Sequence, residues 1–245
     1  YFDLYPWQEM LLPKSVPNDL DDMPKLAITR SRSALNGIAK FPDNQKRMWS
    51  AYYASVTFMD EQVGRILDEL DRLGLREQTA IVFTSDHGYH LGEHTFWQKS
   101  NLHEEVTRVP LIISMPGGRT GRSKSLVELV DLFPTLSAVA GLKAPGGLHG
   151  TSLLPILSDP AVRVKESALS IHGSGVSMRI AGWTYTRYKD GSEELYDMEK
   201  DPGQFSNLAF SKQDEHVVQL KKVRAIFNKR LKAAELKPGK LRNSR

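Results

Sequence analysis

Apolar side chains recur at three- and four-residue steps from Asp43 to Leu73, which is the period of an amphipathic helix. The apolar stripe consists of Tyr52, Val56, Met59, Val63, Ile66, Leu67, Leu70 and Leu73. Gly74 follows at a place where helices commonly end. Residues 1–42 are rich in Pro, Asp and Asn and show no sustained period, so we expect a long irregular connection there.

Two short apolar runs rich in β-branched residues predict strands that are buried on both faces. They are TAIVFT at 79–84 and VPLIISM at 109–115. A further helix is predicted around 134–142, with Pro134 in its first turn and Gly141 at its end. Because strand and helix alternate, we expect a parallel α/β sheet.

The pattern changes after about residue 160, where short strand candidates are separated by glycines. SALSIHG, VSMRIAG and WTYTRYKDG lie close together and ELYDMEKDP follows them, so we expect a small antiparallel sheet. A final helix over about 212–235 carries one apolar side, formed by Val217, Leu220, Val223, Phe227 and Leu231. We therefore divide the chain into an α/β portion, residues 1–160, and a small α+β subdomain, residues 161–245.

The composition is that of an ordinary globular protein, with 40 % hydrophobic and 25 % charged residues among 245. The net charge is +4, but the 33 basic and 29 acidic residues are interspersed, so nucleic acid is not expected as a partner. No apolar run approaches the ~18 residues of a membrane span. The first residues lack the basic and apolar regions of a signal peptide and resemble the middle of a protein. Since cysteine is absent, these residues hold no thiolate zinc site and no cysteine nucleophile.

Asp86 and His87 come directly after the first predicted strand. Ligands of open α/β sheets bind beyond the carboxyl ends of strands, so both side chains could face a cleft. Aspartate supplies a hard oxygen ligand for Ca²⁺ or Mg²⁺ and histidine a nitrogen, while Gly88 and Gly92 let the backbone pass close to an ion. The alternative is that Asp86 caps the following turn and His87 is an ordinary loop histidine. Local chemistry leaves both interpretations open.

The longer string TSDHGYHLGEHTFWQKSNLHEEVTRVPLII at 84–113 resembles the second signature region of the sulfatase branch of the alkaline-phosphatase-like superfamily. Three further segments agree in order and approximate spacing: VELVDLFPTLSAVAGL, LHGTSLLPIL and ELYDMEKDPGQFSNLA. The resemblance covers nearly the whole chain from Asp43 and is closest to the iduronate-2-sulfatase type, because of His87 and the YHLGEH continuation. It implies an alkaline-phosphatase-like sheet with flanking helices. This chain would be its C-terminal portion, followed by the small antiparallel subdomain.

The resemblance also implies roles for single residues. Asp86 and His87 match two ligands of a Ca²⁺ site that, in the family, is completed by two aspartates with no counterpart here. Lys99, thirteen positions after Asp86, matches a catalytic-site lysine that contacts the substrate sulfate; a solvated surface lysine is the alternative. We expect Tyr89 and His94 to line the substrate pocket, with a loop held together by its own side chains as the alternative.

Other polar side chains are interpreted more conservatively. For His103 we favour structural hydrogen bonding over a role in orienting Lys99. Arg179, Arg187 and Lys189 would suit a uronate or a second sulfate, but we favour an alternating strand whose polar face lies in water.

The family reaction is hydrolysis of a sulfate ester by a formylglycine hydrate, made from the Cys or Ser of a C/S-x-P-x-R motif. That motif is absent, so we expect the nucleophile in residues outside this chain and expect the chain alone to be inactive. The substrate we favour is the 2-O-sulfate on a uronic acid of a sulfated glycan. The expected partner is the N-terminal part of the same enzyme, in the same or a separate chain. Export to the periplasm, the extracellular space or the lysosome is implied by the family alone.

Two other functions stay open. A phosphodiesterase or phosphonate hydrolase of the same superfamily would also hold a tetrahedral oxyanion, although one Asp-His pair argues against the two transition metals of phosphatase relatives. A non-catalytic fragment that packs on a partner chain is the other interpretation.

Overall fold

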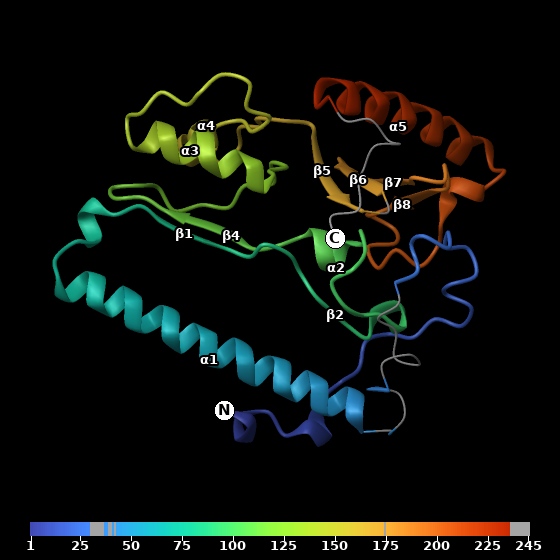
Figure 1. Ribbon diagram of the computed structural model, residues 1–245, viewed down its shortest axis with the longest axis horizontal. Coiled ribbons are helices and arrows are strands. Elements are labelled where there is room, and N and C mark those ends of the chain that lie inside the picture. Colours follow the sequence, from blue (N-terminus) through green and yellow to red (C-terminus); the bar gives the residue numbers. More distant parts are fainter. Residues whose placement is uncertain (30–36, 39–40, 42, 174, 236–245) are drawn as a thin grey trace. The chain divides into compact units, whose positions relative to one another are not determined.

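The computed structural model describes residues 1–29, 37–38, 41, 43–173 and 175–235. Its contacts divide the chain into two compact units, and Figure 1 labels the α-helices and most of the strands. Unit 1 contains residues 1–18, 29–100 and 108–117, and unit 2 contains residues 19–28, 101–107 and 118–245. The division into domains at residue 160 stays a prediction.

The elements of unit 1 are η1 (Phe2–Leu4), η2 (Trp7–Glu9), α1 (Asn44–Arg72), η4 (Arg76–Gln78), β1 (Ile81–Thr84), β2 (His90–Leu91), η5 (Glu93–Thr95), β3 (Trp97–Gln98) and β4 (Leu111–Ser114). Those of unit 2 are α2 (Glu104–Thr107), η6 (Leu129–Asp131), α3 (Leu132–Val139), α4 (Leu154–Ser158), β5 (Ser167–His172), β6 (Gly175–Ile180), β7 (Trp183–Tyr188), β8 (Glu193–Asp197), η7 (Leu208–Phe210) and α5 (Asp214–Ala233). Here η marks a 3₁₀ helix.

The long helix α1 confirms the apolar periodicity, and Gly74 follows its end with φ 68°. The N-terminal segment packs on this helix, because Ser50 donates a hydrogen bond to the Tyr5 carbonyl and the Tyr5 hydroxyl lies 2.6 Å from Thr57 Oγ1. The described part of residues 1–42 contains short 3₁₀ segments and turns but no strand and no α-helix, as expected; the rest of that segment lies outside the described residues.

Strands β1 and β4 form where the apolar runs predict them, but they pair antiparallel, with Ile81 opposite Ser114. The expectation of a parallel sheet is therefore wrong for this pair. Parallel pairing needs a crossover, usually a helix, whereas residues 85–110 contain no helix longer than the four-residue α2. The expected burial of both faces is also wrong, since burial alternates along β4 and Ile112 is 60 % exposed.

The antiparallel sheet predicted after residue 160 is confirmed. Its strands follow one another in the order β5-β6-β7-β8, and α5 covers one face of this sheet (Figure 1). The apolar side of α5 supplies Leu220, Val223, Phe227 and Leu231, which pack against Val176, Met178, Tyr185 and Leu195. Helix α3 also forms as predicted, with Pro134 in its first turn and Gly141 beyond its end at φ 69°.

A buried cluster of charges joins η6 to the C-terminal sheet and helix. Lys165 Nζ lies 2.6 Å from both a Glu128 and an Asp131 carboxylate oxygen, and Arg230 contacts the same Glu128 oxygen at 2.9 Å. Gly150 allows a close passage beside η6, because a Cβ there would lie 2.0 Å from the Val130 carbonyl oxygen. The charged side chains thus hold η6 against β5 and α5.

A second buried network centres on Glu194 of β8. Glu194 accepts hydrogen bonds from the Tyr188 and Tyr196 hydroxyls and lies 3.3 Å from His103 Nε2. Glu194 and His103 are each 1 % exposed, so the favoured structural interpretation of His103 is confirmed. Burial opposes both charges, yet mutual attraction lowers the pKa of Glu194 and raises that of His103.

Replacing Glu194 with Ala is expected to lower the free energy of unfolding by about 3–5 kcal/mol, because it leaves a buried imidazolium and two buried hydroxyls without their acceptor. Urea unfolding of the 245-residue chain measures this change. The exposed Glu199→Ala variant serves as control and should change stability by less than about 0.5 kcal/mol. Equal losses in the two variants would contradict the role assigned to the network.

The same pair predicts a pH dependence of stability. Below its ordinary pKa of 6.5, His103 is protonated in both states and its contribution is complete; as pH rises through the raised folded pKa, that contribution is lost. The contribution of Glu194, whose pKa is lowered, is complete above 4.5 and is lost as pH falls through the folded value. The urea midpoint should fall above pH 6.5 in the wild type, and this fall should be smaller in His103→Phe. An unchanged slope in that variant would refute the assignment.

Candidate metal and sulfate site

Asp86 and His87 lie directly beyond the end of β1, where the sequence places them. Asp86 Oδ1 accepts a hydrogen bond from the His87 backbone N–H at 3.0 Å, so the carboxylate caps the turn. The side chain is nevertheless 84 % exposed, and its other oxygen, Oδ2, lies 3.5 Å from His87 Nε2. The capping role therefore coexists with an oxygen that is available on the surface.

A backbone hydrogen bond orients the ring of His87. Nδ1 lies 2.9 Å from the Gly88 carbonyl oxygen, and because a carbonyl only accepts, Nδ1 is the donor. In the neutral ring Nε2 then carries the lone pair, next to Asp86 Oδ2. Metal-binding histidines are commonly held in this way, through one ring nitrogen and a backbone carbonyl.

This donor set fits part of a cation site. It offers one carboxylate oxygen and one imidazole nitrogen, whereas Ca²⁺ takes about 6–8 ligands, mostly oxygens. Across the residues that the structure describes, no group of three or more His, Cys, Asp or Glu side chains is arranged to hold a metal ion. Further ligands would have to come from elsewhere.

The loop after His87 is a short hairpin in which β2 pairs with β3. Gly92 makes the tight turn possible with φ 113°, and its N–H donates to the Phe96 carbonyl at 2.9 Å. Glu93 accepts a hydrogen bond from the Leu91 N–H, and Trp49 of α1 donates one to the Leu91 carbonyl, both at 2.6 Å. Glu93 thus supports the loop. Burial acts to raise the pKa of its carboxyl, but its hydrogen bonds outweigh this effect and lower the pKa.

His94 lies inside this hairpin and is only 2 % exposed. Its ring contacts those of Phe96 and His90, with centroids 5.8 and 6.3 Å away. His94, Thr95 and Gln98 all have positive φ, a conformation that costs about 1–3 kcal/mol for such residues and persists only where the surroundings enforce it. The contacts of His90 and His94 fit the alternative interpretation, a loop that is held together by its own side chains. Contact of His94 with substrate stays a prediction.

The two other predicted site residues have different surroundings. Tyr89 is half-buried and its ring lies 5.6 Å from that of Tyr52 on α1; burial raises the pKa of its hydroxyl. Lys99 follows β3 and is exposed. The structure thus brings Asp86 and His87 together, while the roles of Tyr89 and Lys99 stay predictions. Sequence reasoning missed the supporting role of Trp49, for which the aromatic residues of α1 were the available signal.

Two of the basic residues singled out in the C-terminal region, Arg179 and Arg187, are engaged within the fold, whereas Lys189 is exposed. Arg179 donates hydrogen bonds to the Ile180 and Trp183 carbonyls. Arg187 lies 4.7 Å above the Phe227 ring and donates to Asn228. Both arginines therefore already have partners inside unit 2.

Comparison with known proteins identifies the family. Residues 23–142 match the family model described as Sulfatase. A sulfatase from Formosa agariphila is 31 % identical over 219 residues, covering 85 % of this chain and 42 % of the relative. A choline-sulfatase from Rhizobium meliloti is 33 % identical over 218 residues, with the same shares covered. The chain therefore spans less than half the length of these curated relatives.

Solved structures agree with the predicted fold class. A structure described as a 2-O GAG sulfatase is similar with a TM-score of 0.78 and 25 % identity, covering 93 % of this chain and 53 % of the other. A phosphonate monoester hydrolase from Silicibacter pomeroyi shares the fold, with a TM-score of 0.80 at 23 % identity over 94 % of this chain and 52 % of the other. The alkaline-phosphatase-like α/β class with a small antiparallel C-terminal sheet is thus confirmed. Among the described helices, none has both the length and the apolar character of a membrane span.

Replacing Gly92 with Ala should destabilise the hairpin by about 1–3 kcal/mol, because φ 113° is strained for a residue with a side chain and the new Cβ would lie 3.4 Å from Pro13 and Trp97 atoms. Urea unfolding measures the change. Gly64→Ala is the matched control: Gly64 lies within α1 with open space around it, so Ala should stabilise by about 0.5–1 kcal/mol. Changes of the same sign in both variants would contradict the strain at Gly92.

Proposed function

Because the chain belongs to the sulfatase family through residues 23–142, we propose that it forms the C-terminal part of an enzyme that hydrolyses sulfate esters. The observation that carries this proposal is the Asp86–His87 pair beyond β1, with its exposed carboxylate oxygen beside His87 Nε2. The nucleophile, a formylglycine, belongs to residues outside this chain. Alone, the chain is then inactive.

Asp86 and His87 would hold one Ca²⁺ ion together with ligands from the N-terminal part of the enzyme. A bound Ca²⁺ supplies positive charge against the sulfate oxygens. Asp86 contributes formal negative charge to the site, and the Gly88 carbonyl keeps His87 in the tautomer whose Nε2 lone pair can bind a metal. Further carboxylate ligands outside this chain would complete the coordination.

Lys99 is proposed to contact the sulfate group. Its ammonium is a compact charge with three donors and an exposed position, which suits a tetrahedral oxyanion. Placed within reach of the ester oxygen as well, the ammonium would stabilise the negative charge that builds up on this leaving oxygen as the S–O bond breaks. Lys99 would therefore influence kcat as well as substrate binding.

For the substrate we propose the 2-O-sulfate on a uronic acid of a sulfated glycan. The similar structure described as a 2-O GAG sulfatase supports this class, although regiospecificity also depends on parts of the enzyme outside this chain. Tyr89 is proposed to offer its ring to the sugar, since its hydroxyl stays protonated and its body is held against Tyr52. His94 is proposed to line the same pocket from the hairpin.

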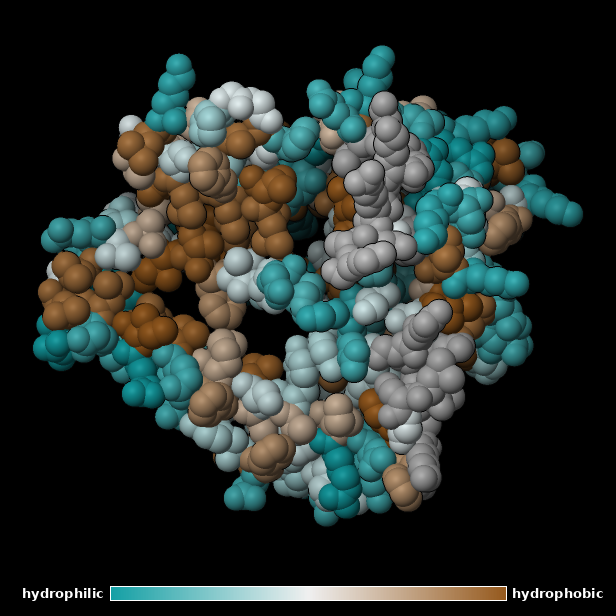
Figure 2. Space-filling view, in the orientation of Figure 1, coloured by the Kyte–Doolittle hydropathy of each residue, from teal (hydrophilic) through white to brown (hydrophobic). Residues whose placement is uncertain are grey.

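Exposed apolar side chains of unit 1 support the interpretation that another part of the enzyme packs on this unit. Val56, Phe58 and Ile66 of α1 and Ile112 of β4 are all exposed, which is costly in water unless another surface covers them. Figure 2 shows hydrophobic surface in the region of β1 and β4. We propose that the N-terminal part of the enzyme covers them, in the same or a separate chain. By family resemblance the assembled enzyme is an exported or lysosomal protein.

The test uses the enzyme with both parts present and a 2-O-sulfated uronic acid disaccharide. Asp86→Ala should abolish sulfate release and also remove bound calcium, because the site loses a carboxylate ligand. Calcium is measured by elemental analysis and sulfate by ion chromatography. Asp60→Asn, on the exposed side of α1, is the control. An Asp86→Ala enzyme that keeps both calcium and activity would refute the metal assignment.

Lys99→Ala should lower kcat/KM by about 10²–10³-fold while calcium stays bound, because an oxyanion contact is lost without loss of a metal ligand. Lys143→Ala, another exposed lysine, should leave kcat/KM unchanged. A phosphonate monoester is assayed in parallel, and faster hydrolysis of that substrate than of the sulfate ester would favour phosphate chemistry.

A further inference from the structure

A run of basic residues follows β4 in a segment without helix or strand. Arg119, Arg122 and Lys124 occur within six residues, and no acidic residue lies between Gly117 and Val127. All three side chains are exposed. The interspersed charges of the chain as a whole hide this local excess of positive charge.

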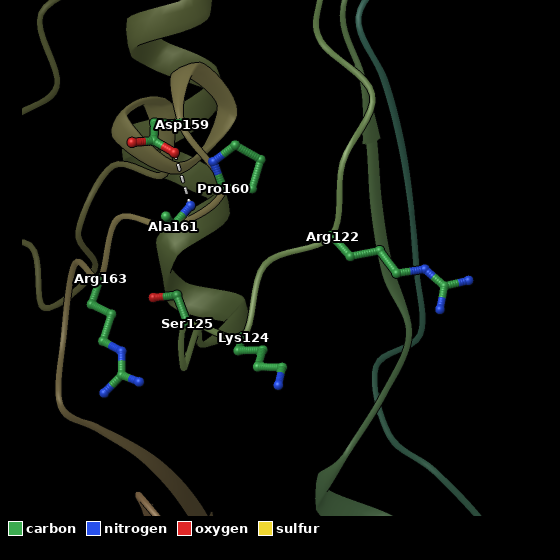
Figure 3. A pocket seen from close by; sticks show the side chains of 7 residues that line it. All are labelled: Arg122, Lys124, Ser125, Asp159, Pro160, Ala161 and Arg163. Carbon is green, nitrogen blue, oxygen red and sulfur yellow. Dashed lines mark hydrogen bonds between the residues drawn. The ribbon is translucent and has the colours of Figure 1, made fainter.

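Arg122 and Lys124 line a surface pocket of about 530 Å³ in unit 2 (Figure 3). Its other lining residues are Ser125, Asp159, Pro160, Ala161 and Arg163. The volume lies within the range of ~300–1,000 Å³ that is common for ligand pockets. Three cationic residues and one carboxylate therefore line this hollow.

Local contacts fix the shape of this pocket. Gly121 passes so close to Pro160 that a Cβ would lie 2.7 Å from its ring. Asp159 accepts a hydrogen bond from the Ala161 N–H at 3.0 Å, and Ser125 Oγ accepts one from the Val164 N–H at 3.4 Å. The single carboxylate is thus already used in a turn.

The three cationic side chains, unlike the Asp159 carboxylate, are not engaged in local hydrogen bonds of the described residues. Within the described part of the chain, the side chains of Arg122, Lys124 and Arg163 make no hydrogen bond or ion pair. Lys165, only two residues after Arg163, is in contrast buried between Glu128 and Asp131. The fold therefore neutralises one basic side chain here and leaves its neighbours exposed at the pocket.

The directions of the side chains indicate the form of the ligand. In Figure 3, Lys124 and Arg163 extend toward the same side of the pocket, whereas Arg122 points away from both. Converging cations would suit one compact ion, while diverging cations suit a ligand with several separated charges. No aromatic side chain lines the pocket, so stacking of nucleic acid bases has no platform here.

We propose that this pocket binds the sulfate and carboxylate groups of an anionic polysaccharide, with Lys124 and Arg163 as the principal contacts. Guanidinium and ammonium groups form charge-assisted hydrogen bonds with both kinds of oxyanion. The inference deepens the proposed function, on which its choice of ligand class rests, because it adds a surface for the same class of polymer. Binding at this pocket does not itself require turnover.

Calorimetric titration of the 245-residue chain with a heparin-derived octasaccharide, at about 0.1 M NaCl, tests the proposal. The double variant K124E/R163E should weaken binding at least about tenfold, and the wild-type affinity should fall steeply with added salt. K143E/K212E changes the net charge equally at exposed positions outside the pocket and should weaken binding less than about threefold. Thermal unfolding of each variant verifies that the fold is retained.

Equal weakening in the two double variants would overturn the proposal, since general attraction to a basic protein would then explain the binding. It would also be overturned if a single-stranded oligonucleotide of equal charge bound as tightly and lost affinity in K124E/R163E to the same degree. Displacement of the octasaccharide by inorganic sulfate at equal molar concentration would also overturn the proposal, because the pocket would then be a site for a single anion only.

The outcome is independent of the sulfatase reaction. In the enzyme with both parts present, K124E/R163E should hydrolyse a monosaccharide sulfate ester as fast as the wild type and lose rate only on the long polymer. An enzyme without sulfatase activity would refute the proposed function while the octasaccharide titration still decides on the pocket. A loss of rate on the monosaccharide equal to that on the polymer would contradict the role of the pocket.

Discussion

Unit 2 depends on a carboxylate that has no access to water. Glu194 is surrounded by the Tyr188 and Tyr196 hydroxyls and by His103, which lies 91 residues earlier in the chain. Moving an ion out of water costs several kcal/mol, and only a complete set of partners offsets this cost. The network therefore joins residues 101–107 to the C-terminal sheet, and the short segment belongs to unit 2 although its neighbours in sequence belong to unit 1.

The candidate site rests on a different constraint, the strained hairpin after His87. Gly92 supplies a positive φ without strain, whereas His94, Thr95 and Gln98 adopt one at a cost. Hydrogen bonds from Trp49 and to Glu93 hold Leu91 in place and so stabilise this conformation. Such strain commonly occurs at functional sites, where a fixed geometry matters more than maximal stability. The exposed Asp86 and the half-buried His87 lie directly before this hairpin.

The charged residues of unit 2 fall into two groups with different consequences. Lys165 and Arg230 are buried or half-buried with carboxylates, so they contribute to the fold. Lys124 and Arg163 remain exposed at a pocket and leave its charge uncompensated. The sequence does not show which basic residue belongs to which group, because Arg163 and Lys165 are only two residues apart and are similar in charge.

Much of the architecture follows from local patterns. The apolar period of α1, the glycine at its end, the two β-branched runs and the glycine-punctuated C-terminal strands were all sufficient to place elements, since burial of a regular face imposes its period on the sequence. The position of Asp86 and His87 beyond β1 followed from the same patterns, and the longer TSDHG string indicated the family. These features depend on residues that are close together in the chain.

Only the tertiary structure showed how the strands pair and which side chains interact with one another. The direction of β4 relative to β1 was wrongly inferred, because alternating elements indicate a crossover only where a helix actually connects the strands. The burial of His103 against Glu194, the orientation of the His87 ring by Gly88, and the difference between Arg163 and Lys165 were likewise invisible in the sequence. Each depends on atoms brought together across long or irregular segments, and a hydrogen bond is decided by distances of tenths of an ångström that no periodic pattern encodes.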